Sequence, residues 1–485
     1  MSRRTTLDPL RGCLEGVIPA TVATCAVDGT PNATFVSQMQ YVDPQHVALS
    51  FQFFNKTREN VLANPLVTAI VIDPVTAASY RLSLLYLRTE TEGPLYQAMK
   101  AKLAGIASHT GMAGVFALRG ADLYAVAAVE ELHGDRLPRP PRAHPPLRAL
   151  RQATLLLAGC ADLGQLFDQT MALLAQEFGI THAMLLMADV PGQRLYTVAS
   201  RGYGVTGVGS EIAFGDGVIG VAASYRVPIR INHMTAEYRY GSAAREGAAD
   251  APPLDAAIPF PGLAEPHSQL AVPLVAGGRL LGVLCVESMR DLAFDHEDED
   301  ALVALAALLG AAVAALQQTS DAGEPLGQTP WASPAGAATS ATSGSPTASS
   351  TIPANTPTGP PQPNRETEAG DAGSAADPPV DVRHYRANHS IFVGSDYLIK
   401  GVAGAILWKL LQTQAASGRQ DFSNRELRAM PDIGLPDLND NLEARLVLLQ
   451  RRLAERCPAI VLQRTGRGQL RLQLRGRLRL SDVEG

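Results

Sequence analysis

The first stretch with the residue types of a binding site is FNKTRENVLANP, residues 54–65. Lys56 supplies a cation, Thr57 a hydroxyl and Asn60 an amide one turn further on. A helix that begins here also presents backbone N–H groups without partners inside the helix, and such groups bind phosphate. The pattern therefore predicts an anion site. The alternative is a simple helix cap with a solvated lysine.

A second stretch with chemical character is TGRGQLRLQLRGRLRL, residues 465–480, which holds five arginines and no acid. Polar and apolar residues alternate from Gln469 to Arg475, which predicts a half-buried strand. The whole chain has net charge -6, yet residues 381–485 contain 17 Lys+Arg against 11 Asp+Glu, and residues 1–380 contain 24 against 36. A basic terminal unit on an acidic protein indicates nucleic acid as its partner.

Composition limits the other classes of protein. A chain of 485 residues should form two to four domains. The start has no apolar core of a secretory signal, and the longest apolar run, residues 301–316, is shorter than the roughly 20 residues that span a bilayer. Five cysteines without a CxxC pair argue against a zinc site or a disulfide framework. We therefore expect a cytoplasmic protein with no membrane span.

Two breaks divide the chain. Residues 318–380 are rich in Ala, Ser, Thr, Pro and Gly without an apolar period, which predicts a disordered linker. A shorter proline-rich break, RLPRPPRAHPP, covers residues 136–146. Three folded domains are expected, at residues 1–135, 147–317 and 381–485.

The terminal domain should hold three helices and a β-hairpin. A helix is predicted over residues 401–417, with Gly418 as its stop, and Ser423 and Glu426 have the spacing of a capping box for a second. The third, within residues 437–456, carries a leucine stripe (Leu442, Leu446, Leu449, Leu453), and its opposite side shows Asn441, Arg445, Leu448, Arg451 and Arg452. Residues 459–464 and 469–474 then form two strands joined by TGRG.

Residues 390–480, through LEARLVLLQRRL and RTGRGQLRL, resemble the winged-helix DNA-binding domain of response-regulator-type transcription factors. The resemblance implies that the third helix enters the major groove of duplex DNA and that the hairpin touches the backbone. The predicted DNA-binding residues are Asn441, Arg445, Arg451, Arg452, Arg467 and Arg471. The alternatives are a solvated arginine face or a protein-interaction module.

The first domain reads as six or so strands with short turns, which predicts a closed antiparallel barrel. Residues 10–135, centred on NKTREN and the following NP, resemble the flavin-binding split barrels related to pyridoxamine 5'-phosphate oxidase. That resemblance implies an FMN phosphate held at Lys56 and Thr57. The full predicted cofactor set is Ser50, Gln52, Asn55, Lys56, Thr57 and Asn60.

The barrel departs from that family in two ways. The strand FVSQMQYV carries no basic residue, and no carboxy-terminal arginine/histidine signature for pyridoxamine follows the barrel. Vitamin oxidation is therefore not expected. Flavin, a related cofactor, haem, and an empty barrel used for dimerisation remain the alternatives.

The middle domain resembles a GAF domain over residues 147–317, through FGDGVIGVAA, VPIRI and LAVPLVAGGRLLGVLCVES. The resemblance implies a sensor of a small molecule or cofactor that dimerises through its flanking helices. Its ligand is not identified. His233, Tyr238, Tyr240 and His267 are expected in the pocket lid, each histidine otherwise being a surface residue, and Cys285 is expected in the core. No catalytic or metal-binding constellation is predicted.

The sequence thus predicts a multidomain protein: an all-β split barrel, an α+β GAF domain, a disordered linker and a winged helix-turn-helix. The expected function is a cytoplasmic, homodimeric one-component transcription regulator that senses a signal through the barrel and the GAF domain. The alternative is an FMN-dependent oxidoreductase regulated by its GAF domain. The basic charge confined to the last hundred residues favours the regulator.

Overall fold

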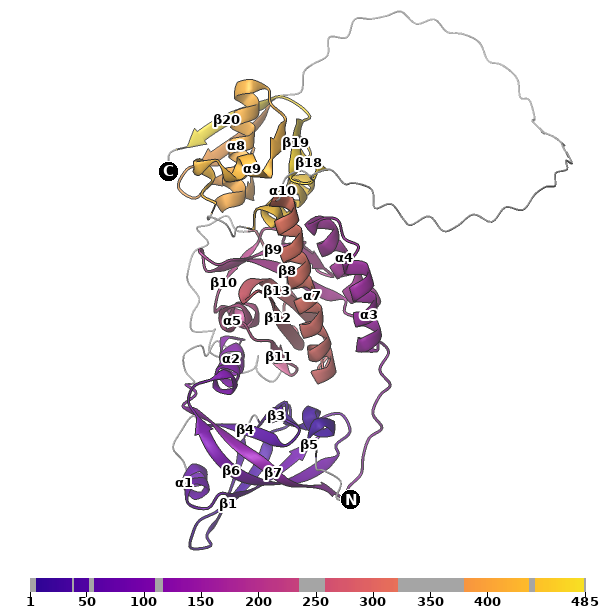
Figure 1. The fold of residues 1–485 in the computed structure, drawn as a ribbon, viewed down its shortest axis with the longest axis vertical. Coiled ribbons are helices and arrows are strands. Elements are labelled where there is room, and N and C mark those ends of the chain that lie inside the picture. Colours follow the sequence, from indigo (N-terminus) through magenta and orange to yellow (C-terminus); the bar gives the residue numbers. More distant parts are fainter. Residues whose placement is uncertain are drawn as a thin grey trace, which may run out of the picture.

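The computed structural model describes residues 6–36, 39–51, 56–109, 117–234, 258–321, 379–435 and 441–483. Gln52, Asn55, Tyr238, Tyr240 and residues 322–378, most of the predicted linker, lie outside these ranges. Three units follow one another along the long axis of the molecule (Figure 1): the N-terminal unit (6–135), the middle unit (146–321) and the C-terminal unit (379–483).

The N-terminal unit is one coiled antiparallel sheet in the order β2-β1-β5-β6-β7-β4-β3. Its strands are β1 (Ala20–Cys25), β2 (Pro31–Val36), β3 (Met39–Asp43), β4 (His46–Phe51), β5 (Leu66–Ile72), β6 (Ser79–Glu90) and β7 (Gly120–Leu132). Strands β2 and β3 lie at opposite edges of the sheet, because β2 pairs with β1 and β3 pairs with β4.

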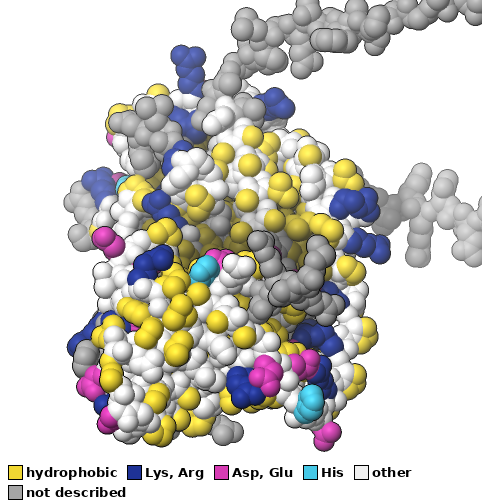
Figure 2. All heavy atoms as spheres, turned by 60° about the horizontal axis from the view of Figure 1, so that its bottom comes forward, with side chains coloured by type: hydrophobic (Ala, Val, Ile, Leu, Met, Phe, Trp, Pro, Cys, Tyr) yellow, Lys and Arg dark blue, Asp and Glu magenta, His cyan; other side chains and the backbone are white. Residues whose placement is uncertain are grey.

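Alternation along the strands builds the core of this unit. In β5, Val67, Ala69 and Val71 are buried while Leu66 and Ile70 are exposed. The helical elements are η1 (Asp8–Leu14), α1 (Lys56–Ala63) and α2 (Pro94–His109). Figure 2, which brings this unit forward, shows hydrophobic side chains on its surface. The large exposed ones are Val27, Phe35, Leu62, Leu66, Ile70, Leu85 and Leu87.

The middle unit is a six-stranded antiparallel sheet in the order β10-β9-β8-β13-β12-β11. Its strands are β8 (His182–Asp189), β9 (Arg194–Arg201), β10 (Glu211–Ala213), β11 (Ile229–Ile231), β12 (Ser268–Ala276) and β13 (Arg279–Ser288). Its helices are α3 (Pro146–Leu157), α4 (Leu163–Gln176), α5 (Gly217–Tyr225) and α7 (His296–Asp321). Helices α3, α4 and α7 share a hydrophobic cluster on one face of the sheet, and α5 belongs to a second cluster on the other face.

Helix α7 contains the long apolar run of the sequence. By length and composition, its residues His296–Gln318 are sufficient to cross a membrane. In the structure, however, Leu302, Leu305, Leu309 and Val313 are buried in the cluster shared with the sheet. This helix therefore packs as a core helix of the middle unit.

The C-terminal unit begins with β14 (Val380–Tyr385), β15 (Ser390–Val393) and β16 (Asp396–Ile399). The helices that follow are α8 (Gly401–Ser417), α9 (Asn424–Arg428), η2 (Pro431–Ile433) and α10 (Leu442–Arg456). The remaining strands are β17 (Asp421–Ser423), β18 (Ile460–Gly466), β19 (Gln469–Leu474) and β20 (Leu478–Val483). Strands β18 and β19 form the predicted hairpin, and β20 pairs in parallel with β14.

Local signals in the C-terminal sequence act as expected. Gly418 ends α8 in the left-handed conformation at φ 72°, which a residue with a Cβ rarely adopts. Ser423 and Glu426 form both bonds of the capping box that begins α9. In the hairpin, Leu470 and Leu472 are buried and Arg471 is exposed.

Candidate functional site

A polar cluster lies in the largely apolar interior between the middle sheet and α5. The Glu287 carboxylate of β13 accepts hydrogen bonds from the Gln269 amide at 2.9 Å and from the Leu263 backbone N–H at 3.0 Å. Gln269 also lies 3.6 Å from the Cys285 sulfur. All three of these side chains are buried. A buried carboxylate among apolar residues is the feature expected of a small-molecule pocket.

Burial dominates the electrostatics of this cluster. Desolvation raises the pKa of the Glu287 carboxyl, although the hydrogen bonds from Leu263 and Gln269 oppose the shift. Desolvation, together with the nearby Glu287 carboxylate, raises the pKa of the Tyr203 phenol and that of the Cys285 thiol well above their usual values. Cys285 is therefore a neutral core thiol in this structure, as expected.

The cluster is held by neighbouring strands of the middle sheet, since Gln269 in β12 is the register partner of Glu287 in β13. Glu287 in β13 is the register partner of His182 in β8, and the His182 ring lies 5.6 Å from the Tyr203 ring. His267, predicted in the lid, is half-buried with its Nδ1 3.7 Å from Asp291, and His233 is also half-buried. The sequence analysis missed Glu287 and Gln269, because both lie in strands that read as continuous apolar core.

Two of the residues predicted to hold a phosphate, Lys56 and Thr57, lie at the start of α1. The Lys56 side chain is 57% exposed, with its Nζ 3.5 Å from Glu59. Asn32 donates to the Thr57 hydroxyl at 2.9 Å, so that the Thr57 O–H proton can still be donated to an anion. A cation, a hydroxyl and the first N–H groups of a helix thus lie together, which fits a phosphate group.

The other predicted cofactor residues do not join this group in the described structure. Asn60 is buried and donates to Thr24 at 3.2 Å, so its amide faces inward. Ser50 is half-buried in β4, opposite Ala121 of β7. Gln52 and Asn55 lie outside the described residues. The fit to FMN therefore rests on the phosphate end alone.

An ion pair that the sequence analysis missed supports the same helix. Arg58 donates to the buried Asp122 of β7, and also to the Thr89 hydroxyl at 3.1 Å. Thr89 in turn donates to Asp122 at 2.5 Å. Arg58 therefore fixes α1 to the sheet. Only the tertiary fold brings Asp122 to it, 64 residues along the chain.

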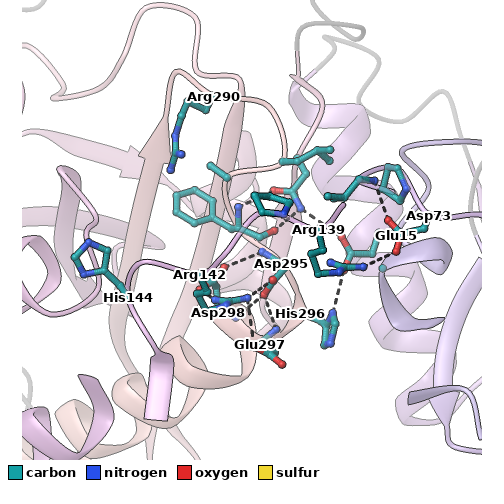
Figure 3. A pocket seen from close by; sticks show the side chains of 18 of the residues that line it. Glu15, Asp73, Arg139, Arg142, His144, Arg290, Asp295, His296, Glu297 and Asp298 are labelled. Carbon is teal, nitrogen blue, oxygen red and sulfur yellow. Dashed lines mark hydrogen bonds and ion pairs between the residues drawn. The ribbon is translucent and has the colours of Figure 1, made fainter. Parts of the chain in front are cut away.

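A cavity of about 600 Å³ lies between the N-terminal and middle units, beside the proline-rich segment (Figure 3). Its charged side chains are largely paired with one another. Arg142 binds Asp295, Asp298 and Glu297, and Arg139 binds Asp73 at 2.5 Å. Arg139 thus ties the proline-rich segment to the N-terminal unit, and Arg142 ties it to the middle unit. Within the described residues, no group of His, Cys, Asp and Glu side chains is arranged to hold a metal ion.

The residues predicted on the DNA-facing side of α10 are not displayed to solvent. Asn441 donates to the carbonyl of Ala188, and Arg445 reaches Asp189 at 3.2 Å. Arg451 donates to Asp168 at 2.6 Å. In the described structure, these three side chains bind the middle unit.

Arg452 requires a correction. The helical projection placed it on the outer side, but it is 4% exposed and donates to the Leu398 carbonyl at 2.8 Å inside the C-terminal unit. The reason is that β16 packs over this part of α10, which a projection of the helix alone does not show. Arg452 therefore positions α10, and we remove it from the candidate DNA contacts.

The hairpin arginines remain at the surface. Arg467 is exposed at the turn between β18 and β19, and Arg471 is exposed while paired with Asp421 at 2.7 Å. Glu443, which is acidic among the basic positions, is buried and accepts from Arg464 and Asn424. Its charge is thus neutralised inside the unit.

Comparisons with known proteins identify part of the chain. Residues 162–313 match the family model of the GAF domain. No curated protein matches the chain. Among solved structures, the GAF domain of a phosphoenolpyruvate-protein phosphotransferase from Coxiella burnetii is 22% identical, covering 36% of this chain and 96% of that chain, with TM-score 0.28.

Two further solved structures are similar to parts of the chain. The free methionine-R-sulfoxide reductase from Neisseria meningitidis is 22% identical, covering 39% of this chain and 99% of that chain, with TM-score 0.28. An FMN-binding protein from Syntrophomonas wolfei is 13% identical, covering 24% of this chain and 80% of that chain, with TM-score 0.22. The family match, together with the six-stranded sheet between two helical layers, identifies residues 162–313 as a GAF domain.

Proposed function

We propose that this protein is a signal-sensing transcription regulator, in which the middle unit binds a small molecule and the C-terminal unit binds duplex DNA. The observation that carries the proposal is the basic edge formed by the hairpin and the residues after it. Arg467, Arg475 and Arg477 are exposed there, and among the described residues no acidic side chain pairs with them. Such an edge suits the phosphate backbone.

The element order of the C-terminal unit supports a winged helix. Helices α8, α9 and α10 are followed by the hairpin β18–β19, as the resemblance implied. In helix-turn-helix domains the recognition helix lies in the major groove and reads base edges with its first turns. On this proposal Asn441 and Arg445 read bases, and Arg467 and Arg471 contact phosphates.

The polar cluster of the middle unit supports a sensory role. Glu287, Gln269 and Tyr203 place acceptors and donors inside a cluster of otherwise apolar side chains. The ligand class that suits this site is a small molecule with a hydrogen-bond donor for Glu287 and an apolar body.

A second input is proposed at the start of α1. Lys56 and Thr57 suit a flavin phosphate, and a bound flavin would supply redox chemistry as a second signal. On this proposal, the role of Lys56 and Thr57 is to bind and orient that phosphate.

The proposal is tested by titrating random-sequence duplex with the full chain and with residues 379–485, at several salt concentrations. We expect binding that weakens steeply with salt, because each phosphate contact releases counterions and adds roughly 0.9 to the slope of log K against log salt. Circular dichroism of the fragment checks that it folds. A folded fragment that binds no duplex at low salt would show the arginines to be a solvated face.

A further inference from the structure

Helix α10 lies between the C-terminal and middle units (Figure 1). The side of the helix that faces the middle unit is the side that the sequence predicts to face DNA. At its beginning, Asn441 donates to the Ala188 carbonyl and accepts from the Gln317 amide at 2.9 Å. Asn441 and Arg445 are each only 8% exposed. Neither residue can read a base edge in this arrangement.

The two basic residues of this face are paired with oxygen atoms of the middle unit. The Arg445 guanidinium lies 3.2 Å from Asp189 and 5.3 Å from the centre of the Tyr196 ring. Arg451 donates to the Val198 carbonyl at 2.7 Å and to Asp168 at 2.6 Å. Carboxylate and carbonyl oxygens offer these donors the same chemistry as phosphate oxygens and base-edge acceptors. Each donor can therefore serve the middle unit or DNA, but not both at once.

Apolar contacts complete the interface. Val447 and Leu448 are buried, one turn before Arg451. A Cβ built on Gly164 would lie 4.0 Å from Val447 Cγ2, and one built on Gly209 would lie 3.8 Å from Leu448 Cδ1. The two glycines therefore lie directly under α10. The interface is thus both packed and charge-complementary.

We propose that the middle unit competes with DNA for α10, so that this structure is a closed state in which α10 cannot contact base edges. This inference rests on the proposed function of the C-terminal unit. The docking surface is formed by Asp168, Gly164, Asp189, Val198 and Gly209. The exposed hairpin arginines stay outside it, so the closed state keeps phosphate contacts and loses base reading.

Strand β8 connects the docking surface to the polar cluster. It begins at His182, the register partner of Glu287, and ends at Asp189, which binds Arg445. A ligand that displaces β8 at its first residues would therefore act on the docking surface. Because the Asp168 side chain is 74% exposed, its ion pair contributes little in isolation, as a reversible contact requires.

A disulfide lock tests the inference in the full chain. Gln317→Cys and Asn441→Cys replace two side chains in direct contact, in a Cys25→Ser, Cys160→Ser background that removes the two cysteines that are not buried. Mild oxidation should close the bond. The locked chain should bind duplex at least about fivefold more weakly than the same chain after reduction.

A charge variant gives an independent measurement. Asp168→Asn with Asp189→Asn should raise duplex affinity about fivefold or more and steepen the salt dependence. The matched control, Asp300→Asn with Glu130→Gln, changes the net charge of the chain by the same amount. Both of its ion pairs lie away from the docking surface, so the control should raise duplex affinity less than Asp168→Asn with Asp189→Asn does.

The outcomes separate the two proposals. If the locked chain binds duplex as tightly as the reduced one, or if Asp168→Asn with Asp189→Asn binds duplex no more tightly than its matched control, the competition is refuted while the DNA-binding function stands. If neither the locked nor the reduced chain binds duplex, and the folded fragment 379–485 does not bind it either, then the DNA-binding function itself has failed.

Discussion

The Glu15 carboxylate pairs with the Arg230 guanidinium at 2.6 Å, which joins the end of η1 in the N-terminal unit to β11 in the middle unit. Arg230 also pairs with Glu299 of α7 at 2.6 Å. Both partners of the first pair are about nine-tenths buried. The ion pairs that Arg230 makes with Glu15 and Glu299 thus lie at the interface between the two units.

Removing that cation should loosen the junction. Arg230→Met removes the cation beside the buried Glu15 carboxylate, which keeps the Asn232 amide at 3.4 Å and His296 at 3.8 Å, and the loss should destabilise the junction by about 3–5 kcal/mol. Hydrogen exchange of α2 and β11 should rise in the variant. Adding Glu15→Gln should recover part of the loss, and Arg81→Met, at an exposed pair, should change little. Unchanged exchange in Arg230→Met would show that the pair does not hold the units together.

Flavin binding through α1 is a second prediction. Lys56→Ala should weaken FMN binding to the full chain by about 1.5–3 kcal/mol, because a charge-assisted contact to the phosphate is lost. Quenching of flavin fluorescence measures the affinity, and Lys100→Ala, an exposed lysine on α2, is the control. If wild-type protein leaves the flavin signal unchanged, the cofactor assignment is wrong.

The hairpin should contribute to DNA binding in both the closed and the open state. Arg467→Ala should lower affinity for all duplex sequences alike and reduce the salt slope by about one, because one phosphate contact disappears. Fluorescence anisotropy at four salt concentrations measures the slope. Arg119→Ala, an exposed arginine of the N-terminal unit, should leave it unchanged. An Arg467 variant with the wild-type slope would exclude this residue from the interface.

The polar cluster should make stability depend on pH. Because burial raises the pKa of Glu287 in the folded state, the folded state holds this proton more tightly than the unfolded state does. Its contribution to stability is therefore largest below the unfolded pKa of about 4.5 and declines as pH rises through the folded pKa. Glu287→Gln should flatten that decline in thermal melts. Parallel pH profiles for the variant and the wild type would contradict the assignment.

Assembly is predicted to involve α3 and α7, whose outer faces carry exposed Leu147, Leu155, Val303 and Leu308. We expect a C2 dimer by light scattering at micromolar concentration. Leu155→Glu with Leu308→Glu should give monomers, because charge is placed in an apolar contact. Leu66→Glu, on the exposed face of β5, is the comparison. If Leu66→Glu gave monomers and the double variant did not, the dimer interface would lie on the sheet of the N-terminal unit instead.

The sequence by itself determined the local elements. The capping box of Ser423 and Glu426, the stop at Gly418 and the leucine alternation of β19 were all predicted, and all are present. The middle domain was recognised by its resemblance to GAF domains through FGDGVIGVAA, VPIRI and LAVPLVAGGRLLGVLCVES, and the family match at residues 162–313 confirms it. These features are decided by residues a few positions apart, so that periodicity and caps are sufficient to reveal them.

Only the tertiary structure decided what the arginines of α10 do. The helical projection assigned Arg445, Arg451 and Arg452 all to the side away from the leucine stripe, yet the first two bind the middle unit and the third is buried against β16. The acceptor for Arg452 lies 54 residues away in the chain, and that for Arg451 lies 283 residues away. A side chain's partner at such a separation is set by how whole units pack, and no local pattern encodes it.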